Sequence, residues 1–279
     1  MKCFYHRADL DGQCSGAIVK SRFPHCEMIG IQYGDAFPWD RIEPDETVVM
    51  TDFSLSMDEM ERLSGACVLV WIDHHKSAIE TARAKCFLAS GAQVLETGLA
   101  ACELTWRWCF DTEPCQAVFW LGRYDVWDHH NHPGALAFQY GMRNLQDTSP
   151  DNQSLWQGLF HDDVVSCGLV ERIAQEGRGL LTYETRQNAK YAASCAFEVD
   201  LDGRRAIAIN KGLTNSLLFK EVYDPDRHDC MVSFVRRAKG WTVSVYSDKP
   251  AVDASAICSA RGGGGHHGAA GFQCDVLPF

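Results

Sequence analysis

The stretch that decides the fold is CVLVWIDHH, residues 67–75. Its first six residues are continuously apolar, as expected of a central strand buried on both faces of a parallel sheet. The polar residues Asp73, His74 and His75 follow at once, where such a strand would end. The stretch therefore predicts a buried strand with chemically active side chains at its carboxyl end.

The residues around this stretch alternate short apolar runs with helical patterns. Further strands are predicted at residues 2–5, 28–33 and 47–50, and helices at about 15–22, 100–109 and 113–121. Ser56 and Glu59 form a capping box that opens a helix ending near residue 64. This alternation predicts an α/β fold with a mostly parallel sheet flanked by helices.

The C-terminal part of the sequence has a different pattern. Residues 151–194 are helical and more polar, and 172–193 are the best candidate for a connecting helix. Beyond residue 197, short apolar runs flank the turn signals Asp202-Gly203 and Lys239-Gly240, which predicts antiparallel strands of a smaller α+β domain. We expect a catalytic domain at 1–170, a connecting helix at 171–194 and a second domain at 195–279, with the active site in the cleft between the domains.

Composition narrows the class of protein. The 26 Lys and Arg residues against 37 Asp and Glu residues leave a net charge of −11, which argues against a basic RNA-binding module. No apolar run approaches the roughly 20 residues of a membrane span, and the first residues lack the apolar segment of a signal peptide. We therefore expect a cytoplasmic protein without a membrane partner. The 13 cysteines are scattered singly, which favours reduced thiols packed in the core.

Acidic residues or histidines follow three of the predicted strands. The segment HRADLDG, residues 6–12, follows the first strand, Asp52 follows the third, and Asp73-His74-His75 follow the fourth. Any one of these alone could be a turn residue, a helix cap or an ordinary histidine. The carboxyl ends of parallel strands share one edge of the sheet, so we expect the side chains to converge. Carboxylates with a few imidazoles suit Mn²⁺ or Mg²⁺, and Mn²⁺ is the better candidate.

A glycine run near the C-terminus is a second candidate site. Residues 262–265 are all glycine and lead into His266 and His267. Glycines allow backbone N–H groups to approach a phosphate closely, although a flexible linker is the alternative interpretation. Arg261, Arg236 and Arg237 are candidate phosphate or base contacts.

Together these motifs resemble the DHH phosphoesterases. The resemblance rests on His6-x-x-Asp9-x-Asp11-Gly12, on Asp52, on Asp73-His74-His75, and on GGGGH at 262–266 followed by Ala269-Ala270-Gly271. The superfamily includes RecJ-like exonucleases, nano-RNases, cyclic-dinucleotide phosphodiesterases and family II pyrophosphatases. The glycine-rich element is similar to that of the DHH-associated domain, which closes over the substrate in the nuclease and phosphodiesterase branches.

The resemblance implies two divalent metal ions and a role for each motif residue. His6 and Asp9 would hold one ion, Asp52 would bridge, and Asp11 and His74 would hold the other together with an acidic residue of a fourth motif. For that residue the resemblance favours Asp125 over Asp128 of the string Asp128-His129-His130, which follows a polar loop. His75 would face the substrate phosphate, Asp73 would orient the histidines, and His266 would act on the phosphate or the leaving group. Substrate binding would fall to Arg261, Gly263, Gly264, Gly265, His266 and His267.

The resemblance further implies a two-metal phosphodiesterase, in which the ions activate a water and neutralise charge on phosphorus. The length and the lack of a basic stripe favour short oligoribonucleotides or linear dinucleotides such as pGpG, cut to 5′-mononucleotides. Alternative substrates are a nucleoside bisphosphate or a cyclic dinucleotide. A metal-dependent nucleotide sensor is the non-enzymatic alternative, which an intact ligand set disfavours. No stable protein partner is implied, and a homodimer is compatible with the sequence.

Overall fold

The computed structural model describes residues 1–279, which form two compact units. The first unit comprises Met1–His74 and Ala78–Leu181, and the second comprises His75–Ser77 and Thr182–Phe279. The division falls within helix α8 (Val164–Cys195), which is 32 residues long and begins earlier than the predicted connecting helix. None of the helices has both the length and the apolar character that crossing a membrane requires.

A five-stranded sheet forms the centre of the first unit. Its strands lie in the order β2-β1-β3-β4-β5, and all neighbours pair in parallel. The strands are β1 (Lys2–His6), β2 (Glu27–Ile31), β3 (Thr47–Thr51), β4 (Val68–Asp73) and β5 (Ala92–Leu95). The predicted α/β class and the central position of the apolar stretch are confirmed.

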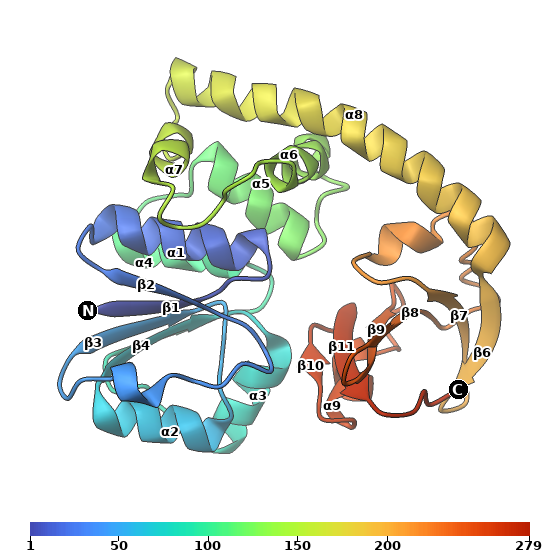
Figure 1. The fold of residues 1–279 in the computed structure, drawn as a ribbon, viewed down its shortest axis with the longest axis horizontal. Helices are drawn as coiled ribbons and strands as arrows, with labels where there is room; N and C mark the ends of the chain where they lie inside the picture. The colour runs from blue at the N-terminus through green and yellow to red at the C-terminus, as the bar shows by residue number, and fades with distance from the viewer. The chain divides into compact units, whose positions relative to one another are not determined.

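Helices cover both faces of this sheet, with α1 and α4 on one face and α2 and α3 on the other (Figure 1). Trp71 of β4 packs in the core with Met60 of α2, whereas its neighbour Ile72 packs on the opposite face with Leu104 of α4. Burial on both faces explains why β4 is apolar without alternation. The helices are α1 (Leu10–Arg22), α2 (Met57–Ala66), α3 (Lys76–Ala84), α4 (Ala101–Phe110), α5 (Gln116–Asp125), α6 (Pro133–Arg143) and α7 (Gln153–Leu159), with a 3-10 turn η1 (Trp39–Arg41).

The strand order contains a topological switch point beside β1. The chain passes from β1 to β2 on one side, and β3 then lies on the other side of β1. In open α/β sheets ligands bind outside the carboxyl ends of the strands at such a point. The segment after β1 and the residue after β3, Asp52, lie at this point.

Helix α1 begins earlier than the sequence indicates. The sequence pattern predicts a loop after residue 6 and a helix from about residue 15, but the helix begins at Leu10. The side chain of Asp9 caps it by accepting a hydrogen bond of 2.9 Å from the Gly12 N–H. Asp11 and Gly12 are therefore helical, and the close packing of α1 against β1 explains the glycine: a Cβ on Gly12 would lie 2.0 Å from the carbonyl oxygen of His6.

The second unit contains a six-stranded sheet in the order β10-β11-β9-β8-β7-β6. Its elements are β6 (Phe197–Leu201), β7 (Arg204–Asn210), the 3-10 turn η2 (Ser216–Phe219), β8 (Cys230–Arg237), β9 (Gly240–Tyr246), α9 (Ala254–Ser259), β10 (Gly264–Gly265) and β11 (Ala269–Cys274). The predicted hairpin at Asp202 and Gly203 is confirmed, and both residues have positive φ, 56° and 78°.

Both predicted hairpins are antiparallel, but one further pairing in this sheet is parallel. Strands β7 and β8 pair in parallel, while the other four pairings in this sheet are antiparallel. A parallel neighbour needs a crossover of a dozen or more residues, and residues 211–229, which include η2, supply one. Strand periodicity alone does not reveal the direction of a neighbour.

The glycine run is part of the sheet and not a flexible linker. Gly264 and Gly265 form β10, which pairs with Gly271 and Ala270 of β11. A Cβ on Gly263 would lie 2.1 Å from the carbonyl oxygen of Gly271. Close backbone packing thus accounts for glycine here.

Two glycine-to-alanine substitutions should shift stability in opposite directions. Gly12→Ala should lower the free energy of unfolding by about 1 to 3 kcal/mol, because the new methyl group collides with the backbone of β1. Gly65→Ala, in the exposed part of α2 where a Cβ meets nothing within 4 Å, should raise it by about 0.5 to 1 kcal/mol. Urea unfolding of both variants measures this, and equal stabilities would refute the packing argument.

Candidate metal centre

The strand ends of the first unit bring two groups of potential metal ligands together. His6, Asp9 and Asp52 form one group, and Asp11, Asp52 and His74 form the other. Within each group the ligand atoms lie within 4.8 Å of one another. Asp52 belongs to both groups, which is the arrangement expected of a carboxylate that bridges two ions.

The two oxygens of Asp52 face different imidazoles. Its Oδ1 lies 3.2 Å from Nε2 of His74, and its Oδ2 lies 3.5 Å from Nδ1 of His6. His6 Nδ1 also lies 2.8 Å from Oδ2 of Asp9. The side chain of Asp52 is buried, so its orientation is held by the protein around it.

Backbone geometry positions Asp52. The residue follows β3 directly and adopts a left-handed conformation with φ of 55°, while its N–H donates to the Ile72 carbonyl at 3.0 Å. A non-glycine residue in this region carries a conformational cost and persists where the surroundings demand it. The turn directs the carboxylate toward the carboxyl edge of the sheet.

Asp11 is held by the N-terminus of helix α4. Its two oxygens accept hydrogen bonds from the N–H groups of Ala101, at 2.9 Å, and Cys102, at 2.8 Å. A helix N-terminus stabilises a carboxylate through its exposed N–H groups and its dipole. The Oδ2 of Asp11 also lies 3.3 Å from His74 Nε2, so α4 fixes this oxygen beside the histidine.

Of the two acidic candidates for the fourth motif, Asp125 and Asp128, Asp125 lies beside His74. Its Oδ2 lies 3.3 Å from Nε2 of His74, at the end of α5. Asp128 instead contacts Arg123 at 3.4 Å and accepts a hydrogen bond of 2.6 Å from Asn131. The potential metal-binding groups contain none of Asp128, His129 and His130.

The electrostatics of the centre call for added positive charge. Burial lowers the pKa of His6, but the carboxylates of Asp9 and Asp52 outweigh this effect and raise it to about 11. Burial, followed by the neighbouring charge of Asp11, raises the pKa of Asp125 well above its usual range. Carboxylates this close cannot all ionise without protons or cations among them.

The ligand set fits two divalent cations. With the four carboxylates of Asp9, Asp11, Asp52 and Asp125 ionised and both imidazoles neutral, the ligand set would carry −4, which two divalent ions would balance. Oxygen donors with two imidazoles are typical of Mn²⁺ and Mg²⁺ sites, whereas zinc sites more often include thiolates. The side chains of this centre are therefore suited to hold metal ions.

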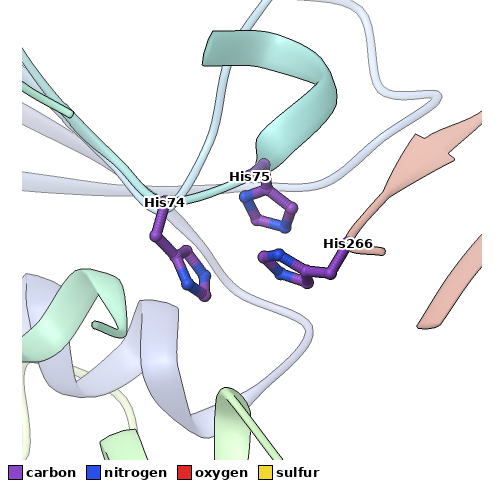
Figure 2. A group of neighbouring side chains, drawn as sticks. All are labelled: His74, His75 and His266. Atoms are coloured by element: carbon purple, nitrogen blue, oxygen red, sulfur yellow. The ribbon is translucent and has the colours of Figure 1, made fainter. Parts of the chain in front are cut away.

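Asp73 and the two histidines after it have different surroundings. The Oδ1 of Asp73 accepts a hydrogen bond of 2.8 Å from the backbone N–H of His74, which fixes the chain where β4 ends. His75 belongs to the second unit, where its ring stacks on that of His266 with centroids 4.8 Å apart and planes 20° apart. Figure 2 shows the two consecutive histidines and the ring of His266 facing His75.

Residues 75–77 make two further contacts in the second unit. Lys76 forms an ion pair with Asp253, the N-cap of α9. The Gly265 N–H donates to Ser77 Oγ at 3.2 Å. The glycine strand therefore lies against the segment that begins with His75.

The other predicted substrate-binding residues have structural partners. The N–H of Gly263 donates to the Cys258 carbonyl at 3.0 Å, so a phosphate cradle built from Gly263 and Gly265 would have to replace existing hydrogen bonds. Arg261 pairs with Asp202 and donates to the Ile257 carbonyl at 2.9 Å. The backbone carbonyl of His267 accepts from the Ala254 N–H at 2.8 Å.

The sequence pattern does not predict two features near the centre. Glu103 caps α4 and forms a buried ion pair with Arg123, which also contacts Asp128. Tyr33 lies beside His6, with ring centroids 5.6 Å apart. Neither has a local signal, because a capping glutamate and a tyrosine after a strand are common in any α/β sequence.

The comparisons with known proteins concern the fold. Neither protein-family models nor curated proteins match the sequence. Among solved structures, the DHH domain of a member of a family of ribosomal proteins aligns with 98% of this chain and 82% of that chain, at 16% identity and a TM-score of 0.56. The chain has the fold of a DHH protein.

Two other solved structures align with this chain at lower TM-scores. A pGpG-specific phosphodiesterase from Vibrio cholerae aligns over 99% of this chain and 93% of that chain, at 11% identity and a TM-score of 0.49. An exopolyphosphatase-related protein from Bacteroides fragilis covers 99% of this chain and 87% of that chain, at 11% identity and a TM-score of 0.47.

Substitution of two histidines should show which Asp-His-His segment binds metal, residues 73–75 or residues 128–130. His74→Ala should remove at least one metal ion per chain, because His74 Nε2 faces three carboxylates. His129→Ala should retain both ions, since His129 lies outside the ligand groups. Elemental analysis after dialysis against Mn²⁺ measures this, and the opposite ranking would assign the metal to the string at 128–130.

Proposed function

We propose that this chain is a two-metal phosphodiesterase that hydrolyses short oligoribonucleotides or linear dinucleotides such as pGpG to 5′-mononucleotides. The observation that carries the proposal is Asp52, a buried carboxylate whose two oxygens face His6 and His74. A bridging carboxylate between two ligand groups suits a phosphoester hydrolase better than a sensor, which needs no pair of ions.

The chemistry divides between the ions and the chain. When bound, a pair of divalent ions lowers the pKa of a water and neutralises charge on the phosphoryl oxygens. Asp9, Asp11, Asp52 and Asp125 would hold the ions through oxygen, and two N–H groups of helix α4 orient the Asp11 carboxylate. No covalent nucleophile on the protein is required.

His75 and His266 are the proposed substrate contacts of this mechanism. Each imidazole can donate a hydrogen bond to a non-bridging phosphate oxygen, and His266 can also steady the leaving oxygen. The two rings are stacked and therefore close together, which supports the proposal that both contact the same phosphate. Asp73 acts as a positioning residue through its hydrogen bond to the His74 backbone.

The overall charge favours a short substrate. With a net charge of −11, the protein offers no general attraction for a long polyanion, whose binding draws on many phosphate contacts. A dinucleotide brings few phosphates, and cations at one centre can bind them locally.

A product assay on 5′-labelled RNAs of two to ten nucleotides, with Mn²⁺ and with Mg²⁺, tests the proposal. We expect 5′-mononucleotides and the fastest turnover on the shortest substrates. Asp52→Ala should reduce turnover at least about a thousandfold with the fold intact, because the bridging carboxylate is lost. Asp45→Ala is the matched control, since Asp45 also has a positive φ, 61°, but is exposed. Near wild-type turnover of Asp52→Ala with its metal retained would overturn the ligand assignment.

The role of His266 can be tested by comparing two substrates. His266→Ala should retain both metal ions but raise KM, lower kcat, or both on a diribonucleotide, because remote contacts help to hold the scissile phosphate. The loss should be smaller on bis-p-nitrophenyl phosphate, which is too small to need the second unit. His161→Ala, at an exposed histidine, is the control. Equal losses on the two substrates, or loss of metal, would contradict a substrate-binding role.

A further inference from the structure

An exposed aromatic side chain lies at the edge of the metal centre. Tyr33 is 51% exposed, yet its ring lies 5.6 Å from that of His6. Three other aromatic side chains are comparably exposed, Tyr183, Tyr191 and Phe197, and all three belong to the second unit. A half-exposed ring beside a ligand group is placed where it can contact a molecule bound at the metal centre.

A buried neighbour supports the ring from behind. Phe53 is 3% exposed, and its ring centroid lies 4.5 Å from that of Tyr33 at an angle of 31°. The Trp71 indole N–H donates to the Phe53 carbonyl at 3.1 Å, which fixes Phe53 to the central strand β4. Tyr33 therefore rests on the core of the sheet.

The turn that carries Tyr33 is also held firmly. The Asp35 carboxylate accepts from the Gln32 N–H at 3.1 Å and pairs with Arg7 at 2.8 Å. Arg7 follows His6 in the chain, and its N–H donates to the Ile31 carbonyl at 2.9 Å. These contacts hold the turn beside the ligand residues, and the Tyr33 side chain is 51% exposed.

We propose that Tyr33 is a stacking platform for a nucleobase of the substrate, next to the phosphate bound at the metal centre. This inference rests on the proposed function. It concerns the nucleobase, which the metal ligands do not contact. Bases stack on exposed aromatic rings in proteins that bind single-stranded nucleic acid, and every base has a π-face. An inorganic phosphate or polyphosphate would gain nothing from such a ring.

We expect Tyr33 to strengthen substrate binding without selecting strongly among the four bases. Stacking tolerates all four bases, so discrimination would come only from differences in stacking strength. Because stacking on a base contributes to substrate binding and not to the chemical step, loss of the ring should raise KM more than it lowers kcat. A ring with only a structural role would instead affect all substrates equally.

Three variants and three substrates test the platform. Tyr33→Ala should raise KM on a 5′-phosphorylated diribonucleotide about tenfold, equivalent to about 1.4 kcal/mol. Tyr33→Phe should stay within about twofold of wild type, because it keeps the ring, and so should the exposed control Tyr183→Ala. The other two substrates are the same dinucleotide with an abasic residue at either the 5′ or the 3′ position. On one of them Tyr33→Ala and wild type should have equal KM values, and that analogue identifies the stacked base.

The outcomes separate the two proposals. If wild type cleaves none of the three substrates with Mn²⁺ or Mg²⁺, the proposed function fails. If wild type cleaves them and Tyr33→Ala raises KM equally on all three, or leaves KM unchanged, the stacking role is overturned while the phosphodiesterase remains. Metal content should be unchanged in Tyr33→Ala, and its loss would make the ring a support of His6 instead.

Discussion

The crowding of carboxylates at one edge of the first sheet is the constraint on which the rest of the structure depends. Asp52 lies between His6 and His74, and its two oxygens face one each. Charges this close repel one another unless protons or cations lie among them, which is why the pKa of His6 rises despite burial. Strands β1, β3 and β4 are parallel, so their carboxyl ends lie at the same edge of the sheet. This arrangement brings together ligand residues that are far apart in the sequence.

Hydrogen bonds and ion pairs from helices α4 and α5 hold the acidic side chains of the centre in place. The N-terminus of α4 donates two N–H groups to Asp11, and Glu103 caps the same helix. Arg123, paired with Glu103, also contacts Asp128. Through these contacts the loop after α5 is tied to α4. Contacts of this kind orient ligand side chains, which lowers the cost of ordering them when an ion binds.

The glycine motif of the second unit has a packing role of its own. The glycine run forms β10, and Gly263 is required by the close approach of β11. Packing alone therefore explains glycine at this position, whatever the run contributes to phosphate binding. Its neighbour His266 stacks on His75, so this motif lies beside the segment after β4. The imidazoles of His75 and His266 are therefore better candidates for substrate contacts than the glycines.

By itself, the sequence determined the α/β class, the buried strand β4 and the clustering of acidic residues and histidines after successive strands. These features follow from local periodicity and from the shared direction of parallel strands, so a single chain reveals them. Only the tertiary structure brought Asp125 rather than Asp128 to His74, paired β7 with β8 in parallel and placed Tyr33 beside His6. Each of these features depends on contacts between segments that are distant in the chain. A local sequence pattern does not determine which distant residues a side chain contacts.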